Sequence, residues 1–294
     1  MLNIEHLYKS FKDNDVIRDL SIEIPDSSIF GLVGINGAGK STLLRLIAGV
    51  YEPDQGSVCF NDSDTSLFPE IRSSIAFVSD EQYYPAGSTI ASVRTLYECM
   101  YDFDFDAYRK YLELFGLNEG MNIRTLSKGN RRRVSLVFAL SIHPKLLLLD
   151  EAYDGLEPLA RLHFKKILAE KIEDEGLTVI ISSHNLKELE DICDSFGILE
   201  DGHIVSYGDL LEARDSVNKY QAAFKEEKTK EDFRDLDLLH FEQEGRVIQL
   251  VVRGERDEIL KQLEDMDPVL VDVLPVSFEE LFIYELESRG DIHE

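Results

Sequence analysis

The chain has 294 residues, of which 57 are acidic and 31 are basic, so its formal net charge is −26. A field of this sign repels polyanions, and we therefore expect no nucleic acid among its partners. No stretch reaches the about 18 apolar residues of a membrane-spanning helix, and no basic region followed by an apolar stretch marks a signal peptide at the N-terminus.

Short apolar runs predict strands through the first 80 residues. The runs LNIEHLY, LSIEI and SVCF alternate between polar and apolar residues, as strands with one buried face do. The runs IFGLV (29–33) and IAFVS (75–79) show no such alternation, as expected of strands buried on both faces. Between these two runs, a Gly-rich turn leads into a predicted helix over 41–49.

The next part of the chain alternates helices and strands. A helical pattern from 88 to 143 is broken near 102–104 and 116–122. Three buried strands follow, LLLLD, TVIIS and FGILE, with predicted helices over 158–175 and 185–194 between them. Strands that alternate with helices predict a parallel α/β sheet, here interrupted by a helical insertion over about 88–143.

The sequence changes character toward the C-terminus. A charged stretch over 225–237 leads to FEQEGRVIQLVVRG, which predicts two strands around a glycine, and helices are expected over 256–265 and 277–288. We therefore divide the chain into a main domain, 1–215, and a small C-terminal α+β domain, 216–294.

Residues 34–41 read GINGAGKS and match the phosphate-loop pattern G-x-x-x-x-G-K-[ST]. Glycines let backbone N–H groups converge on phosphate oxygens, and the helix that follows adds partial positive charge at its N-terminus. We expect Lys40 to reach the β- and γ-phosphates of ATP and Ser41 to give its hydroxyl to Mg²⁺. The nucleotide-binding residues predicted here are Asn36, Gly37, Ala38, Gly39, Lys40, Ser41 and Thr42.

Two carboxylates follow one of the buried strands. Asp150 and Glu151 lie at the carboxyl end of LLLLD, where open α/β sheets place their ligands. Asp150 suits Mg²⁺, and Glu151 is the natural candidate to orient and deprotonate the attacking water. His184 ends the next strand and is placed to hydrogen-bond a γ-phosphate. The predicted catalytic residues for ATP hydrolysis are thus Lys40, Glu151 and His184.

Residues 126–131 read LSKGNR at the start of a predicted helix and resemble the LSGGQ signature of the ATP-binding cassette (ABC) family. With the motifs above, the resemblance covers residues 1 to about 210. It implies a P-loop NTPase core with an antiparallel β subdomain, in which two subunits sandwich two Mg-ATP. Ser127 and Gly129 of one subunit would meet the γ-phosphate held by the other, as bare amides at a helix N-terminus favour an anion.

The resemblance also implies roles for aromatic residues and for a loop. Phe11 matches the aromatic that stacks on adenine, with Tyr8 as the alternative. Residues 154–157 resemble the loop that crosses the dimer interface. Tyr83 and Tyr84 lie where family members receive a helix of the membrane subunit, although packing inside the helical insertion is the alternative.

Three regions depart from the family pattern. Lys128 replaces the usual second-position glycine of the signature, and Asn130 replaces its glutamine. Glu157 stands where aspartate is usual. Asp80 occupies the usual place of a glutamine after the strand IAFVS, and it would bind Mg²⁺-bound water unless Gln82 substitutes through a shift of the loop.

Two further features are open to a second interpretation. Lys128 and the arginines 131–133 make a basic island in an acidic chain, unless Arg132 and Arg133 only neutralise neighbouring acids. The run LPVSFEELF is similar to the tail of exporter-type subunits. Its apolar side chains recur at helical spacing and are interpreted as core or dimer contact: Phe278, Leu281, Phe282 and Leu286.

The set of motifs predicts an ATP-binding and ATP-hydrolysing subunit of an ABC transporter, an exporter by its tail, with ATP and Mg²⁺ as cofactors. The resemblance implies a second ABC subunit and integral membrane permease subunits as partners, which would hold a cytoplasmic chain at the inner face of the cell membrane. The alternatives are a soluble non-transport ABC ATPase and a regulatory partner in a heterodimer. Substrate contacts lie in the membrane subunits of such systems, so this chain does not specify the transported molecule.

Overall fold

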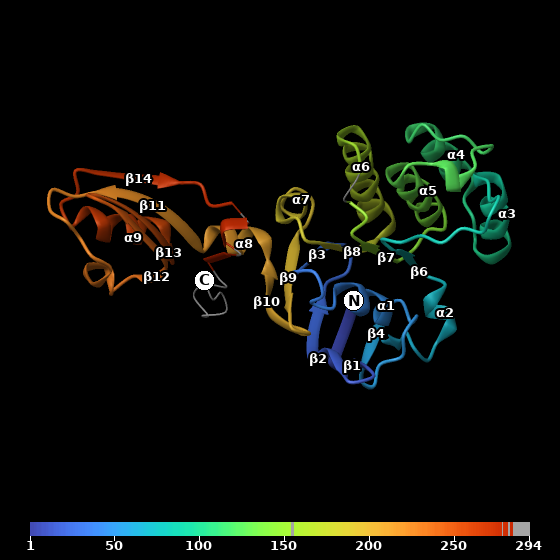
Figure 1. Cartoon of the computed structure of the whole chain (residues 1–294), viewed down its shortest axis with the longest axis horizontal. Coiled ribbons are helices and arrows are strands. Elements are labelled where there is room, and N and C mark those ends of the chain that lie inside the picture. Colours follow the sequence, from blue (N-terminus) through green and yellow to red (C-terminus); the bar gives the residue numbers. More distant parts are fainter. Residues whose placement is uncertain (154–155, 278, 282, 285–294) are drawn as a thin grey trace. The chain divides into compact units, whose positions relative to one another are not determined.

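The computed structural model describes residues 1–153, 156–277, 279–281 and 283–284. The chain divides into two compact units, Met1–Tyr207 and Gly208–Glu294 (Figure 1). Among the described residues, no helix has both the length and the apolar character needed to cross a membrane.

A six-stranded sheet in the order β10-β9-β3-β8-β7-β6 organises the first unit. Parallel pairing joins β6 to β7, β7 to β8, and β3 to both β8 and β9. Every residue of β3, β7 and β8 is buried, which explains why these strands do not alternate in sequence. The strands are β3 (Ile29–Val33), β6 (Ile75–Val78), β7 (Leu146–Asp150), β8 (Thr178–Ser183), β9 (Ser195–Glu200) and β10 (His203–Asp209).

An antiparallel sheet in the order β2-β1-β4-β5 forms the predicted β subdomain. Helix α1 (Lys40–Ile47) contacts β2 of this sheet and β7 of the parallel sheet, so one apolar core includes Leu20, Leu44 and Leu148. Because α1 follows β3 through a short loop, its N-terminus is fixed beside the carboxyl end of β3. The strands are β1 (Leu2–Phe11), β2 (Asn14–Ile24), β4 (Gln55–Phe60) and β5 (Ser63–Asp64).

The helical insertion has the predicted segments and breaks. Each helix begins at a polar cap whose side chain accepts a backbone N–H bond, Thr89, Asp104 and Ser127 in turn. Phe138 of the third helix stacks on a tyrosine from each of the other two, with ring centroids 4.7 and 5.7 Å apart. In Figure 1 these helices lie together beyond the β6 edge of the sheet. They are α3 (Ile90–Met100), α4 (Phe105–Leu114) and α5 (Lys128–Leu140).

Of the remaining helices of this unit, only α6 is long, among those that the structure describes. Helix α6 has the bounds that the sequence predicts, whereas the helix predicted over 185–194 already ends at Glu190. The elements are α2 (Pro69–Arg72), η1 (Ile123–Thr125), α6 (Pro158–Glu175) and α7 (Leu186–Glu190).

The second unit is an antiparallel sheet in the order β12-β13-β11-β14 with one face covered by α9. Ile259 and Leu263 of α9 are buried in a core with Tyr220 and Leu250. Strand β13 matches the prediction, β12 begins at Asp237 and so before the predicted start at Phe241, and β11 and β14 did not stand out as strands in the sequence. The elements are α8 (Leu210–Asp215), β11 (Val217–Ala223), η2 (Lys230–Phe233), β12 (Asp237–Glu244), β13 (Val247–Arg253), α9 (Arg256–Glu264) and β14 (Leu270–Leu274).

The C-terminal helix predicted over 277–288 is described only in part. Residues 279–281 and 283–284 are helical, and the Ser277 hydroxyl accepts the Glu280 amide at 3.2 Å. Leu281 of the predicted apolar stripe is buried. The other members of that stripe, Phe278, Phe282 and Leu286, lie outside the described residues.

Candidate functional site

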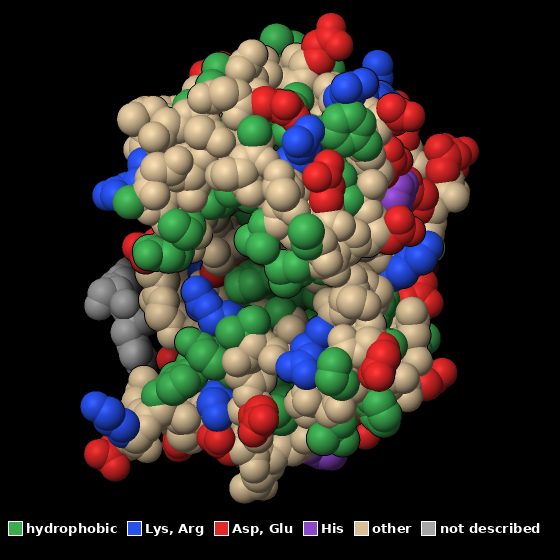
Figure 2. Space-filling model, turned by 90° about the vertical axis from the view of Figure 1, so that its right-hand side faces the viewer, with side chains coloured by type: hydrophobic (Ala, Val, Ile, Leu, Met, Phe, Trp, Pro, Cys, Tyr) green, Lys and Arg blue, Asp and Glu red, His purple; other side chains and the backbone are tan. Residues whose placement is uncertain are grey.

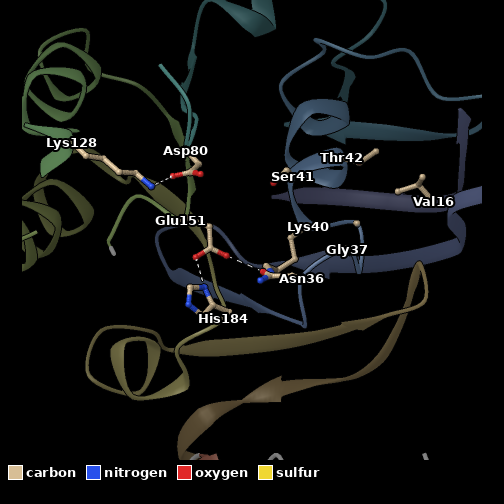
Figure 3. A pocket seen from close by; sticks show the side chains of 11 residues that line it. Val16, Asn36, Gly37, Lys40, Ser41, Thr42, Asp80, Lys128, Glu151 and His184 are labelled. Carbon is tan, nitrogen blue, oxygen red and sulfur yellow. Dashed lines mark hydrogen bonds and ion pairs between the residues drawn. The ribbon is translucent and has the colours of Figure 1, made fainter. Parts of the chain in front are cut away.

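A pocket of about 430 Å³ lies where the phosphate loop meets the carboxyl ends of β7 and β8 (Figure 3). This volume is in the range of small-ligand sites. The structure brings together side chains that are far apart in sequence, from the start of β2 to the end of β8. The lining residues are Val16, Asn36, Gly37, Gly39, Lys40, Ser41, Thr42, Asp80, Lys128, Glu151 and His184.

The phosphate loop has the backbone that its glycines predict. Gly39 caps α1 with φ 109° and Gly37 has φ 89°, conformations that side chains with a Cβ rarely adopt. In the part of the chain that the structure describes, no neighbouring atom lies within 4 Å of the position of a Cβ on Gly37, whereas a Cβ on Gly34 would come within 2.4 Å of the Leu199 carbonyl oxygen. Since the first amides of α1 have no acceptor within the helix, the loop offers N–H donors to an anion.

Lys40 is buried beneath this loop, with 6% of its surface exposed. Its Nζ donates to the carbonyl oxygens of Gly34 (2.6 Å) and Ile35 (3.2 Å) and lies 3.7 Å from Glu151 Oε1. Burial lowers the pKa of Lys40 below its usual value, although the charges of Glu151 and Asp150 oppose the shift. An ammonium held mostly by neutral carbonyls gains stability when an anionic phosphate arrives.

Asp150 is 1% exposed, and its two carboxylate oxygens differ in their hydrogen bonds. Its Oδ1 accepts bonds from the hydroxyls of Ser41 (2.8 Å) and Ser182 (3.0 Å). Its Oδ2 is buried and has no hydrogen-bond partner among the described residues, and the Arg45 guanidinium lies 4.0 Å away, beyond hydrogen-bond distance. A buried carboxylate oxygen without a donor is costly, and a divalent cation would satisfy it.

The residues at this point therefore fit Mg²⁺. The Ser41 hydroxyl and the Asp150 carboxylate are oxygen ligands of the kind that Mg²⁺ takes. The described residues contain no group of three or more His, Cys, Asp or Glu side chains able to hold a metal. Mg²⁺ would therefore need phosphate oxygens and water to complete its coordination, as in other phosphate-bound sites.

Glu151 leaves strand β7 in the left-handed conformation, with φ 51°. This costs on the order of 1 kcal/mol for a residue with a Cβ, and two bonds from its amide to the Ser182 oxygens, both 3.2 Å, hold it there. Its Oε2 lies 2.8 Å from Nδ1 of His184, which is about half exposed. The turn thus directs Glu151 into the pocket, and His184 fixes the carboxylate (Figure 3).

Asp80 lies in the pocket between two cations. Lys128 Nζ is 2.9 Å and Arg132 Nη2 is 2.5 Å from the same Asp80 oxygen. Burial would raise the pKa of Asp80, but the bonds and charges of these two partners hold it below its usual value. Gln82 does not line this pocket and donates to the Ser79 carbonyl at 3.3 Å. The predicted contact of Asp80 with Mg²⁺-bound water stays a prediction, because this conformation gives Asp80 two protein cations instead.

Several predicted site residues do not line the pocket. Ser127 accepts the Asn130 amide at 3.2 Å as the cap of α5, and Gly129 follows in its first turn. Ala38 belongs to the phosphate loop, but it is buried in the apolar core. Phe11 is exposed and packs edge-on against Tyr51, with ring centroids 5.3 Å apart. The roles of Ser127 and Gly129 across a dimer, and of Phe11 on adenine, stay predictions.

The arginines after the signature neutralise neighbouring acids. Arg132 pairs with Asp80, and Arg133 pairs with Glu157 at 3.0 Å. Both ion pairs are of the kind that the second interpretation expects, and whether the two arginines do more than neutralise these acids stays a prediction. Of the predicted interface loop, 154–155 lie outside the described residues.

Sequence reasoning did not assign four contributors to the site. Val16 and Lys128 line the pocket, and Arg132 supports Asp80 from within α5. Ser182 bonds to both Asp150 and Glu151 because strand pairing places it directly beside Asp150. Alignment of the strand ends LLLLD and TVIISS could have predicted Ser182, but nothing in the sequence pairs Arg132 with Asp80.

Comparisons with known proteins agree with this geometry. A family model described as ABC transporter matches residues 17–154. The ABC transporter ATP-binding protein YtrB of Bacillus subtilis (strain 168) is 28% identical over 290 residues, which are 98% of this chain and 99% of YtrB. The lipopolysaccharide export system ATP-binding protein LptB of Escherichia coli (strain K12) is 31% identical over 218 residues, 70% of this chain and 90% of LptB.

Solved structures show the same fold. A structure described as the ATP binding subunit of an ABC transporter has a TM-score of 0.67 at 28% identity and covers 73% of this chain and 92% of its own. The ATP-binding cassette MJ0796, solved as a dimer in a post-hydrolysis state with ADP and Pi, has a TM-score of 0.64 at 20% identity. The chain therefore belongs to the ABC transporter family, as an ATP-binding subunit with an ABC ATPase domain.

Proposed function

We propose that this subunit binds Mg-ATP in the described pocket, closes with a second ABC subunit around two Mg-ATP, and drives separate permease subunits. The observation that carries the proposal is the convergence of Lys40, Glu151 and His184 on one pocket beside the phosphate loop, with Asp150 bonded to Ser41 beneath it. Each of these groups already has the partners that orient it. The site therefore needs little rearrangement to hold a triphosphate.

The side chains divide the work of hydrolysis between them. Lys40 and the loop amides bind the β- and γ-phosphates, while Ser41 and Asp150 hold Mg²⁺, which supplies positive charge to the phosphate oxygens. Glu151 orients a water molecule and takes its proton as the oxygen attacks the γ-phosphorus, so that ADP leaves and phosphate forms. His184 keeps Glu151 in place by donating from Nδ1, and a bond from Nε2 to a γ-phosphate oxygen would require that Nε2 also carries a proton.

The permease subunits would dock on a second hollow of the same unit. This hollow, of about 370 Å³, is lined mainly by apolar and aromatic residues of β6, α3, α5 and the loop after β6. Tyr83 is 90% exposed there, whereas the Tyr84 hydroxyl lies 2.6 Å from Ser135 Oγ of α5. Figure 2 shows hydrophobic side chains gathered around a hollow on this face. We infer that Tyr83 serves the permease and that Tyr84 packs on the insertion.

The direction of transport and the domain roles follow by analogy. LptB belongs to an export system by its name, and we propose that this chain also serves an exporter from the cytoplasmic face of the membrane.

The match to YtrB extends over almost the whole chain, so that protein shares the C-terminal region. We propose that residues 1–215 form the nucleotide-binding domain and that 216–294 form an accessory domain.

ATP binding and hydrolysis by the purified chain test the proposal. We expect magnesium-dependent ATP binding and basal hydrolysis, with both reduced at least about tenfold in Lys40→Ala because its charge-assisted bonds to phosphate are lost. Lys166→Ala, which removes an exposed lysine of α6, is the matched control. Equal ATP affinity in Lys40→Ala and wild type would refute the site. Absence of basal hydrolysis with intact binding would favour a regulatory partner.

Docking to the permease is tested separately. Tyr83→Ala removes an exposed aromatic outside the nucleotide pocket and should weaken co-purification with a polytopic membrane protein while basal hydrolysis persists. Co-purification of the wild-type chain with ribosomes or DNA, and with no membrane protein, would instead support the soluble non-transport alternative.

A further inference from the structure

An ion pair crosses the mouth of the nucleotide pocket. Asp80 follows strand β6, Lys128 begins helix α5, and both line the pocket with the phosphate loop. Their 2.9 Å contact therefore joins the helical insertion to the edge of the parallel sheet (Figure 3). The two residues are also the two clearest departures from the family pattern on this side of the pocket.

The two cations on Asp80 differ in their freedom to leave. The Arg132 side chain is 2% exposed, whereas the Lys128 side chain is 64% exposed. Water competes for an exposed ammonium, so the pair with Lys128 is weak, and removing the buried guanidinium from its carboxylate is costly. If Lys128 moves away, Asp80 still keeps its bond to Arg132. Lys128 is thus the exchangeable partner of Asp80, and Arg132 is the fixed one.

The pocket needs an exposed cation when a triphosphate enters. Glu151 and Asp80 line it, Asp150 lies beneath it, and the whole chain carries a net charge of −26. Among the described lining residues, the lysines are Lys40 and Lys128. Lys40 is engaged by two carbonyls at the base of the loop, so the ammonium that faces solvent belongs to Lys128.

We propose that Lys128 is a phosphate-binding residue that leaves Asp80 when ATP binds and pairs with a terminal phosphate, with Asp80 as its partner in the nucleotide-free state. The proposal rests on the proposed ATP site. The terminal phosphate belongs either to ATP in the same pocket or to ATP held by a second subunit. The chemistry is the same in both cases, and the two sources differ in whether a dimer is required.

The affinities for ATP and ADP in Lys128→Ala test this role. In a Glu151→Gln background, which prevents turnover, we expect ATP to bind about tenfold more weakly and ADP to bind within about twofold of the parent. General damage to the site would weaken both nucleotides. Lys128→Arg should restore ATP affinity. Lys110→Ala is the matched control, because Lys110 is 62% exposed and paired with Glu170 outside the pocket.

Protein concentration separates the two sources of phosphate. A loss of ATP affinity in monomers, verified by sedimentation, supports ATP in the same pocket. Unchanged monomer affinity combined with lost ATP-dependent dimer formation supports ATP held by the second subunit. The proposal is overturned if Lys128→Ala changes neither the ratio of ATP to ADP affinity nor the dimerisation.

Asp80→Asn is an independent test, because it should change the affinity for ATP in the opposite direction to Lys128→Ala. Weakening the pair frees Lys128, so ATP should bind about threefold more tightly, and this gain should vanish when Lys128→Ala is present as well. If Asp80 instead serves Mg²⁺-bound water, Asp80→Asn will weaken magnesium-dependent binding in both backgrounds and overturn its assignment as the partner of Lys128. If Lys40→Ala loses ATP binding but the Lys128 and Asp80 variants show none of the expected effects, only the role of Lys128 is refuted. If Lys40→Ala binds ATP as well as the parent does, the ATP site itself is refuted.

Discussion

The two sides of the nucleotide pocket are held in place by different interactions. On the phosphate-loop side, Lys40 and Asp150 are almost fully buried and bonded to carbonyl or hydroxyl groups at 2.6 to 3.2 Å. On the α5 side, Asp80 and Lys128 are partly exposed and joined by an ion pair. Buried bonds of the first kind persist when solvent or salt changes, whereas an exposed ion pair exchanges easily with water and other ions.

This contrast indicates a preformed half and an adaptable half. A preformed half binds phosphate without losing much conformational entropy, so it can supply affinity. The adaptable half contains Asp80 and Lys128, two residues at which the sequence departs from the pattern that the family resemblance implies. The predictions below test whether the two halves behave as differently as their contacts indicate.

The largest expected effect is the loss of hydrolysis in Glu151→Gln. The substitution keeps the shape of the side chain but removes the base, so the turnover rate should fall about a thousandfold. ATP affinity should change by less than about threefold, because the preformed phosphate contacts remain. Steady-state hydrolysis and equilibrium nucleotide binding measure the two quantities. Hydrolysis at the parental rate would show that another group is the base.

Arg132 and Lys128 should differ sharply in their effect on stability. Arg132→Met removes the buried cation from Asp80, which is partly exposed and keeps Lys128, so it should lower the free energy of unfolding by about 2 kcal/mol. Lys128→Ala removes only an exposed pair and should lower it by less than about 1 kcal/mol. Urea unfolding at one pH and salt concentration compares the two variants. Equal losses would contradict the division of the α5 side into a fixed and an exchangeable cation.

His184→Ala should have an intermediate effect on catalysis. Without the bond from Nδ1, Glu151 keeps its charge but loses its orientation, so the turnover rate should fall roughly tenfold to a hundredfold. The KM for ATP should change much less. His143→Ala is a useful control, since His143 is likewise hydrogen-bonded to carboxylates, those of Glu175 and Asp104, but lies outside the pocket. A large rise in KM with unchanged turnover would place His184 in ground-state binding instead.

The smallest expected effect is a dependence of ATP affinity on alkaline pH. Burial lowers the pKa of Lys40 from 10.5 in the nucleotide-free protein, and bound phosphate favours its charged form. ATP binding then takes up a proton, so the affinity for ATP should fall about two- to fivefold as the pH rises through the lowered pKa of Lys40. Calorimetry in two buffers of different ionisation enthalpy detects the proton, and Lys40→Arg should abolish its uptake.

The sequence predicted the preformed half because its chemistry is local. Gly37, Gly39 and Lys40 act through the backbone of one loop, and the ends of parallel strands meet at one edge of the sheet, which brings Glu151 and His184 together. The α/β fold with its antiparallel β subdomain and helical insertion was predictable for a similar reason, since strand and helix periodicities identify which faces are buried.

Only the tertiary structure decided the contacts between elements that are distant in the chain. Arg132 meets Asp80 across 52 positions of the chain, a contact that no motif indicated. Whether two such side chains touch depends on how α5 and β6 pack, and residue types alone do not state this. Strands β11 and β14 escaped prediction because short runs of mixed polarity become strands only through pairing with neighbours. The sequence by itself therefore determined the family, the phosphate loop and the ends of the catalytic strands, while long-range packing decided which charges face one another across the pocket.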